Sequence, residues 1–504
     1  MRPLKIATVL IFIGISTACC LLSLSDRTAK SDNDDKSFAF HAVSLRPAAP
    51  DTVHGNFDRD NRLKFYGAEA EMTRDGDDFL MKITSPNGSN SYKIKAVTGT
   101  KRIEEYVAHD GEKSIRLPVA YDLETKRWFG INAAVFEPEN DDPYRHQTDW
   151  NANCASCHLD RDAANLADIQ HSKLDSDTSL LVCATCHAKG LEINFPEIDQ
   201  IASPGFPSGV VVAGHKSEAL DAATTFADGS IRLAAHEYQG IFRSLCYQKS
   251  KAAGHGVTGE KISCVSCHSG KNGMMSPMTE EKIQNFSACT DCHQQFSTPE
   301  SVAEHTKHEA VTVGSSCYNC HMPEVVYGHM RFQRTHEINV PNPELTALKS
   351  VPNACNLCHL DKSVNWAVEK SRLMWPERFR LSHVSKDSQF DQPEALRGLF
   401  AGDAFTRGLT ANALAKHADP SWFAPFAIEA FQNEDYPLVR YFLSNALAAD
   451  SNFPDMDYRV LKKKGVDVWS RFFPQIRPKQ RTQIEATADA LRRKRPLHEP
   501  VIAE

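Results

Sequence analysis

Beyond its first 25 residues, the sequence lacks any apolar run of the roughly 20 residues that a membrane-spanning helix needs. It also lacks a strong excess of either charge, since the net charge is −7 over 504 residues. The first absence leaves the N-terminus as the only candidate membrane segment, and the second gives no reason to expect a nucleic-acid partner. With 41% hydrophobic and 24% charged residues, the composition is that of a globular protein. The length predicts about three domains.

The N-terminus differs from the rest of the chain. Arg2 and Lys5 precede an apolar stretch over 6–24, and polar residues follow at once. This order is typical of an export signal, so we expect 1–25 to be a signal peptide or an uncleaved N-terminal anchor. Cys19 follows small residues, which leaves lipidation as a further alternative. We therefore expect an exported protein in the periplasm, on the outer face of the inner membrane or at the cell surface, with this segment as a potential tether.

Cysteine is concentrated in one pattern, Cys-x-x-Cys-His, which occurs six times and contains twelve of the 15 cysteines. Two of the other three, Cys19 and Cys20, belong to the N-terminal segment, and Cys246 stands alone. The six motifs contain Cys154, Cys157 and His158; Cys183, Cys186 and His187; Cys264, Cys267 and His268; Cys289, Cys292 and His293; Cys317, Cys320 and His321; and Cys355, Cys358 and His359.

Four chemistries compete to explain these motifs. In an exported protein, twelve cysteines could form six disulfides, and a single Cys-x-x-Cys could be a redox dithiol. Zinc would need four ligands at each site. None of these explains a histidine directly after every second cysteine. Covalent haem does, because both cysteines form thioethers to the haem and the histidine binds its iron. We therefore expect six covalently attached c-type haems, with the motif histidines as proximal ligands.

A second axial ligand is expected for each low-spin iron, and it is usually His or Met. Methionine is scarce after the N-terminal segment, and its one cluster, at 274–278, lies next to the third motif. Fifteen of the 21 histidines lie outside the motifs, which favours two histidines on each iron. The candidate distal ligands are the histidines that lie near motifs, and we expect six of these eight to bind iron: His146, His171, His236, His255, His305, His308, His329 and His336.

Cys246 has two interpretations. It is either a small buried apolar residue or a thiol near a haem face. It is not a seventh motif, because neither a second cysteine nor a histidine follows at the required positions.

The chain divides by composition. Residues 26–37 are charged and polar and are expected to be a linker. Residues 38–150 lack a motif and show alternating apolar residues around Asn87-Gly88, which predicts a hairpin in a small antiparallel β domain. Two more short strands are expected within 114–131.

Residues 151–370 contain all six motifs, whose first cysteines are 29, 81, 25, 28 and 38 residues apart. Aliphatic runs are sparse here, so we expect an irregular hexahaem domain of helices and loops whose core is completed by the haems. In the longest gap, 233–251 predicts a helix.

Residues 390–495 have apolar residues at helical spacing, which predicts an α-helical domain of HEAT-like pairs. Pro420 and Pro437 are expected at helix starts. The basic run at 492–495 is expected to be a solvated face. The predicted fold class is thus a multidomain chain with a β domain, a hexahaem domain and a helical domain.

Residues 60–370 resemble a bacterial group of multihaem cytochromes related to the tetrahaem electron carrier of hydroxylamine oxidoreductase. The matching words are "TDWNANCASCH" at 148–158, "CYNCHMP" at 317–323, "THEINVPNPEL" at 335–345 and "PNACNLCHLDKSVNW" at 352–366. The resemblance implies that His336, and one of His305 and His308, are distal ligands. Two features depart from the group: Ala188-Lys189-Gly190 replaces a Gly-Pro-Gly turn after the second motif, and the C-terminal repeats are few.

Two functions follow from these observations. Closely spaced haems with two histidines each would carry electrons between other redox proteins of the cell envelope, with no catalytic residue of the chain's own. The alternative is a reductase of a small nitrogen or sulfur oxyanion, which needs one open iron and nearby proton donors. Related nitrite reductases often mark that iron with Cys-x-x-Cys-Lys, which this chain lacks. A third hypothesis is a binding or sensing module built on the helical region.

Overall fold

The computed structural model describes residues 45–150, 224–253, 262–268, 280–448 and 476–499, apart from single positions within these ranges, together with Cys154, Tyr458, Trp469 and Pro474. The predicted export segment and linker, the second motif, most of the first motif, and the candidates His171 and His255 lie outside the described residues.

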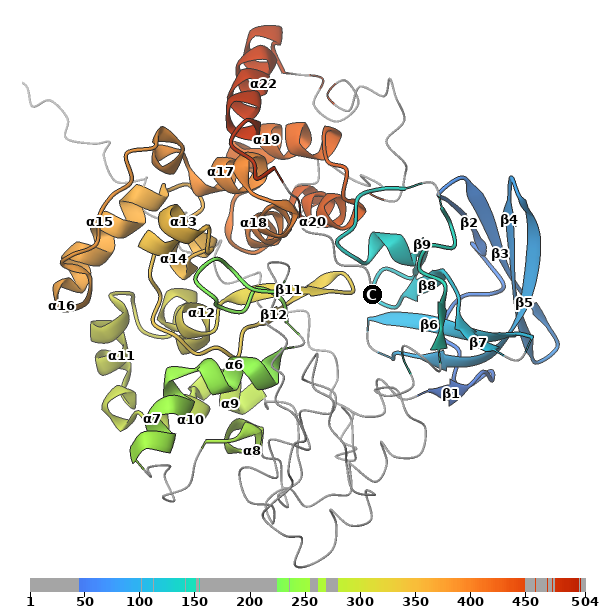
Figure 1. Cartoon of the computed structure of the whole chain (residues 1–504), viewed down its shortest axis with the longest axis horizontal. Coiled ribbons are helices and arrows are strands. Elements are labelled where there is room, and N and C mark those ends of the chain that lie inside the picture. The colour runs from blue at the N-terminus through green and yellow to red at the C-terminus, as the bar shows by residue number, and fades with distance from the viewer. Residues whose placement is uncertain are drawn as a thin grey trace, which may run out of the picture. The chain divides into compact units, whose positions relative to one another are not determined.

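The N-terminal region is a ten-stranded antiparallel sheet (Figure 1). Its main path runs β10-β7-β6-β5-β4-β3-β2, while β1 pairs with β5, and β8 pairs with β6 and β9. The strands are β1 (Arg46–Pro47), β2 (Arg62–Phe65), β3 (Ala68–Asp75), β4 (Asp78–Ser85), β5 (Gly88–Thr98), β6 (Ile103–Asp110), β7 (Lys113–Arg116), β8 (Val119–Asp122), β9 (Arg127–Gly130) and β10 (Thr148–Asp149).

Buried and exposed side chains alternate along several strands of this sheet. In β3 and β4 every second side chain is buried, and the cross-strand partners Met72 and Met81 are both fully buried. The predicted hairpin is confirmed: β4 and β5 pair from Ser85 and Gly88 outward, and Gly88 has a φ of 137°. The expected two strands within 114–131 are three, β7, β8 and β9. Pro118 separates β7 from β8 because it has no N–H to donate to a ladder.

Short elements dominate the region that carries the motifs. They are α6 (Glu237–Arg243), α7 (Leu245–Ala253), α8 (Cys264–Cys267), α9 (Glu280–Asn285), α10 (Ser287–Thr290), α11 (Pro299–Thr306), α12 (Cys317–His321), β11 (Glu324–Gly328), β12 (Arg331–Arg334), α13 (Glu344–Lys349), α14 (Ala354–Cys358), α15 (Val364–Met374) and α16 (Pro376–Phe379). Two short helices, α6 and α7, replace the one expected over 233–251. Their own cluster of buried residues has three members, Tyr238, Ile241 and Tyr247.

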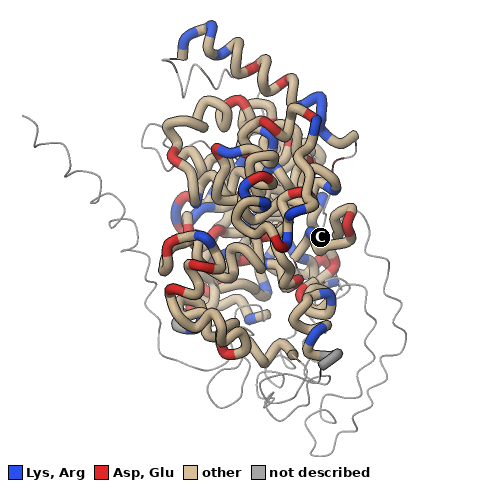
Figure 2. Tube along the Cα trace, turned by 90° about the vertical axis from the view of Figure 1, so that its left-hand side faces the viewer, with Lys and Arg blue, Asp and Glu red and all other residues tan. Residues whose placement is uncertain are grey.

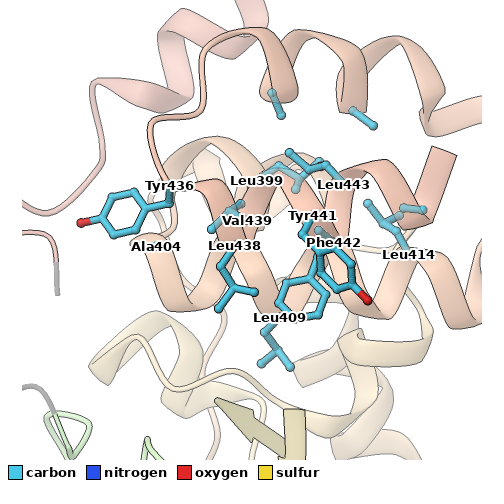
Figure 3. Packing of buried hydrophobic residues seen from close by; sticks show 14 of the residues in the cluster. Leu399, Ala404, Leu409, Leu414, Tyr436, Leu438, Val439, Tyr441, Phe442 and Leu443 are labelled. Atoms are coloured by element: carbon cyan, nitrogen blue, oxygen red, sulfur yellow. The ribbon is translucent and has the colours of Figure 1, made fainter. Parts of the chain in front are cut away.

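The C-terminal region is helical, as expected. Its helices are α17 (Glu394–Ala401), α18 (Ala404–His417), α19 (Pro420–Gln432), α20 (Pro437–Ala448) and α22 (Pro478–Arg492). Pro420 and Pro437 open α19 and α20, which confirms both predicted starts. Figure 3 shows the apolar side chains of α17, α18 and α20, among them Leu399, Leu409 and Leu438, gathered in one buried cluster.

One hydrophobic core joins the sheet region to the C-terminal helices. Phe136, which follows β9, packs edge-on against Phe405 of α18, with 4.9 Å between the ring centroids. Nearby, the guanidinium of Arg440 forms a bidentate ion pair with Glu139 at 3.1 and 3.3 Å. Residues 39–504 accordingly form one compact unit.

Acidic and basic residues are interspersed along the described part of the chain (Figure 2). Within that part, none of the helices combines the length and the apolar character needed to cross a bilayer.

Candidate haem-binding site

The four fully described motifs each form about one helical turn. In three of them the backbone N–H of the histidine donates to the carbonyl of the first cysteine at 2.9 Å. This i, i+4 bond brings the imidazole to the same face as the first thiol. The bonds join His268 to Cys264, His293 to Cys289 and His359 to Cys355.

The cysteines of these motifs have free thiols. Of the ten described cysteines, none forms a disulfide. Burial raises the pKa of Cys267 to about 11 and that of Cys320 to about 12. A redox dithiol needs a thiolate and therefore a lowered pKa, which these two thiols lack, although the hydrogen bond from Cys289 lowers the pKa of Cys317 to about 7. In the described residues, no group of three or more His, Cys, Asp and Glu side chains is gathered as a metal site.

Three pairs of imidazole rings are the central feature of the site. His268 and His336 have ring centroids 6.2 Å apart and planes at 23°. His305 and His321 are 6.1 Å apart at 9°, and His308 and His359 are 6.1 Å apart at 27°. Each pair joins the histidine of one motif to a histidine outside the motifs.

The separation of these rings fits a metal ion between them. Rings in direct, offset contact have centroids about 4.5–7 Å apart, a range that includes the observed 6.1–6.2 Å. A metal bound to a nitrogen of each imidazole at about 2.0–2.1 Å places the centroids about 6.3 Å apart. The observed distances agree with both arrangements, and a metal is favoured because each pair joins one motif histidine to a histidine outside the motifs. The residues therefore fit an iron with two axial imidazoles.

Hydrogen bonds fix the orientation of two of these rings. His321 Nδ1 donates to the carbonyl of Asn339 at 2.9 Å, and His308 Nδ1 donates to the carbonyl of Thr306 at 2.7 Å. Because a carbonyl only accepts, Nδ1 carries the proton and Nε2 is left with the lone pair that binds a metal.

Burial also favours the neutral, metal-binding form of the histidines. It lowers the pKa of His305 below the ordinary 6.5, and the neighbouring His321 lowers it further. Burial likewise lowers the pKa of His359, with His308 as the next cause. Two of the three pairs thus contain an imidazole that is held uncharged near neutral pH.

Both members of "HTKH" belong to ring pairs, although the family resemblance implies only one. On a continuous helix His305 and His308, three residues apart, would share a face. Here α11 ends at Thr306, and Lys307 takes the left-handed conformation with a φ of 58°. The chain therefore turns between them, and they reach the histidines of two different motifs.

Sulfur atoms of consecutive motifs are neighbours. The thiols of Cys289 and Cys317 form a hydrogen bond that raises the pKa of the donor Cys289 and lowers that of the acceptor Cys317. After burial, the next influences that raise the pKa of Cys320 are Cys355 and Cys358. The fourth, fifth and sixth motifs thus follow one another in space as they do in the sequence.

Cys246 lies near the thiols of the third and fourth motifs. Burial raises its pKa, and Cys292 is the next cause. Cys246 also helps to raise the pKa of Cys267. Cys246 is only partly buried, less than the first interpretation expects, and a thiol beside a haem stays a prediction.

The remaining described candidates have other surroundings. His146 is buried, and its Nε2 lies 2.9 Å from Glu137 Oε2. His236 is buried, and its Nδ1 lies 3.2 Å from the carbonyl oxygens of Leu233 and Ala234. The ring centroid of His329 is 6.1 Å from that of Tyr327.

The fourth motif differs from its neighbours. His293 is exposed, and in the part of the chain that the structure describes no second imidazole ring is paired with it.

Comparison with known proteins found no relative: no family model, no curated protein and no solved structure matches this chain. The assignment of function therefore depends on the motifs and on the paired imidazoles.

Proposed function

We propose that this protein is a multihaem c-type cytochrome that carries electrons in the cell envelope. The observation that supports it most strongly is the set of three imidazole pairs with centroids 6.1–6.2 Å apart, each containing one motif histidine. A redox dithiol or a disulfide does not account for such pairs.

Four residues would hold each haem in the paired sites. Two motif cysteines provide the thioether attachments, the motif histidine is the proximal ligand, and the paired histidine is the distal ligand. For the third, fifth and sixth motifs the distal ligands are His336, His305 and His308. Haem bound there supplies reversible one-electron chemistry of iron.

The protein's own residues favour transfer rather than reaction. Two imidazoles would close both axial positions, so a substrate would have no coordination position at these three sites. The contact between Cys289 and Cys317, and the proximity of Cys320 to Cys355, bring successive attachment points together. This arrangement favours short steps between neighbouring sites.

The proposal also covers the identity of the domains and of the N-terminal segment. Residues 151–370 form a hexahaem domain of the group related to the tetrahaem carrier, and the C-terminal helices form HEAT-like pairs. The first 25 residues direct export, and the partners are other redox proteins of the envelope.

The experiment that tests this proposal is a haem count combined with spectroscopy. The protein is produced in a host that attaches c-type haem, and its mass is compared with that of the bare chain. We expect six haems that resist acid-acetone extraction and mostly low-spin ferric signals. A protein with fewer than five covalent haems would contradict the proposal.

The exposed His293 supports a second candidate, a reductase with one open iron. An iron bound by His293 alone would have a free axial position for a small oxyanion. A high-spin ferric signal that is lost together with Cys289 and Cys292 would favour this candidate.

A further inference from the structure

A five-residue segment, Thr335–Asn339, contacts ligands of two different motifs. Its His336 is paired with His268 of the third motif, with 6.2 Å between the ring centroids. Its Asn339 holds His321 of the fifth motif at two points: the Asn339 carbonyl accepts from His321 Nδ1 at 2.9 Å, and the Asn339 N–H donates to the His321 carbonyl at 3.3 Å. The segment therefore links the third and fifth sites.

Glu337, in the middle of this segment, is a buried carboxylate with 7% of its surface exposed. Its Oε2 accepts from the backbone N–H of Ile231 at 2.8 Å and lies 3.3 Å from Arg243 Nε. Its Oε1 accepts from the side-chain amide of Asn339 at 2.9 Å. One carboxylate thus ties the segment to α6 on one side and to Asn339 on the other.

The segment also packs closely against α6. A Cβ on Gly240 would lie 3.1 Å from Glu337 N and 3.3 Å from His336 Cβ. These contacts are tight, so glycine at this position lets the helix approach the backbone that carries His336.

We propose that Glu337 is a positioning residue for axial ligands of two haems, the distal His336 of the third site and the proximal His321 of the fifth. This inference rests on the proposed function. Glu337 holds the Asn339 carbonyl where it accepts from His321 Nδ1, and such a bond makes an imidazole a stronger donor to iron. Its buried negative charge also stabilises the oxidised, more positive state of both irons.

The test compares redox titrations and low-spin ferric spectra of the haem-loaded full chain. Signals of the third and fifth sites are assigned by their loss in His336→Ala and His305→Ala. Glu337→Gln keeps the shape but replaces one acceptor oxygen by an NH₂ donor, so the donors of Ile231, Arg243 and Asn339 can no longer all be accepted. We expect it to displace both assigned signals and to move both midpoint potentials to more positive values, while the sixth site is unchanged.

Two further variants test the effects on the fifth site and on the third site separately. Asn339→Ala keeps the backbone carbonyl but removes its anchor, and is expected to displace the signal of the fifth site alone. Gly240→Ala presses on His336 and is expected to displace the signal of the third site alone. Glu344→Gln is the matched control, because Glu344 also accepts a backbone N–H, that of His383 at 2.8 Å, but lies outside the segment.

The outcomes are distinguishable. Wild-type signals in Glu337→Gln, with all haems attached, would overturn this inference and leave the cytochrome proposal intact. If Glu337→Gln does not accumulate, an unchanged fifth signal in Asn339→Ala overturns the inference. A wild-type chain without covalent haem would instead overturn the proposed function itself.

Discussion

The imidazole rings of His305 and His321 have centroids 6.1 Å apart and planes that are 9° from parallel. His305 comes from α11 and His321 from the end of α12, so two separate elements bring the rings together. The distance suits a metal between the rings, and the pairing of a motif histidine with a histidine outside the motifs favours that arrangement.

This relationship predicts that His305 and His308 serve two different irons. Each single alanine variant should convert one low-spin signal to a high-spin signal, and the double variant should convert two, because the rings face different motifs. Ferric spectra at low temperature measure this. His383→Ala is the control, since the His383 side chain is 83% exposed. Loss of the same signal in both single variants would contradict the assignment.

How much of this site the sequence reveals depends on the type of interaction. The motif residues can be predicted from the sequence because c-type haem attachment needs two cysteines and a histidine at fixed spacing. The choice between His305 and His308 is not readable, since it depends on a left-handed Lys307 that ends α11. Lysine rarely adopts this conformation, so no local signal marks it. The hydrogen bond from His321 to Asn339 cannot be predicted from the sequence either, because its acceptor is a backbone carbonyl and every residue has one.

The sheet is more predictable than the motif region for a physical reason. Alternation and a turn at Asn87-Gly88 identify the hairpin because sheet burial repeats every two residues. Between 224 and 379, most described helices are shorter than three turns, and the buried cluster on α6 and α7 has three members. Hydrophobic periodicity therefore predicts little of the structure in this region.

The fifth motif should be needed for folding as well as for redox chemistry. Replacing Cys317 and Cys320 with alanine removes one attachment and leaves the space around α12 without its large apolar group. We expect loss of one haem and a sharp fall in yield, measured by mass and by soluble protein. The matched control, Cys246→Ala, removes a cysteine outside the motifs and should keep all six haems. Normal yield and stability after loss of the fifth haem would contradict a haem-completed core.

The C-terminal helices should depend on ordinary packing. Phe423 of α19 is fully buried in the cluster that joins the sheet region to the helices. Phe423→Ala should lower the free energy of unfolding by about 3–5 kcal/mol. Leu497→Ala, at a side chain that is 98% exposed, should have little effect. Denaturant titration of the haem-loaded proteins measures both, and equal midpoints would refute the burial of Phe423.

Acid should weaken the site that contains His305. Because burial lowers its pKa in the folded protein below 6.5, the unfolded chain binds more protons at acidic pH. The contribution of this group to stability is therefore fully present above pH 6.5 and is lost as the pH falls through the lowered pKa. A pH titration of the ferric spectrum should reveal high-spin iron only well below pH 6.5, because the iron competes with the proton for the same imidazole nitrogen. In His305→Ala this acid transition should be missing, and an unchanged transition would show that another group causes it.

The last prediction separates a carrier from an enzyme. In the proposed cytochrome, imidazoles would take both axial positions of the iron at the three paired sites, so these irons would exchange electrons without binding a substrate. The exposed His293 marks the fourth motif as the site where an open iron would be found. Reduced protein should pass electrons quickly to another cytochrome or a soluble dye, and only slowly to nitrite, hydroxylamine, tetrathionate or sulfite. Protein adsorbed on an electrode should give reversible signals whose size is unaffected by these oxyanions. The informative control is the variant without Cys289 and Cys292, because among the described motifs it lacks the one whose histidine has no paired imidazole. A sustained catalytic current that cyanide blocks, and that this variant lacks, would replace the carrier function with the reductase.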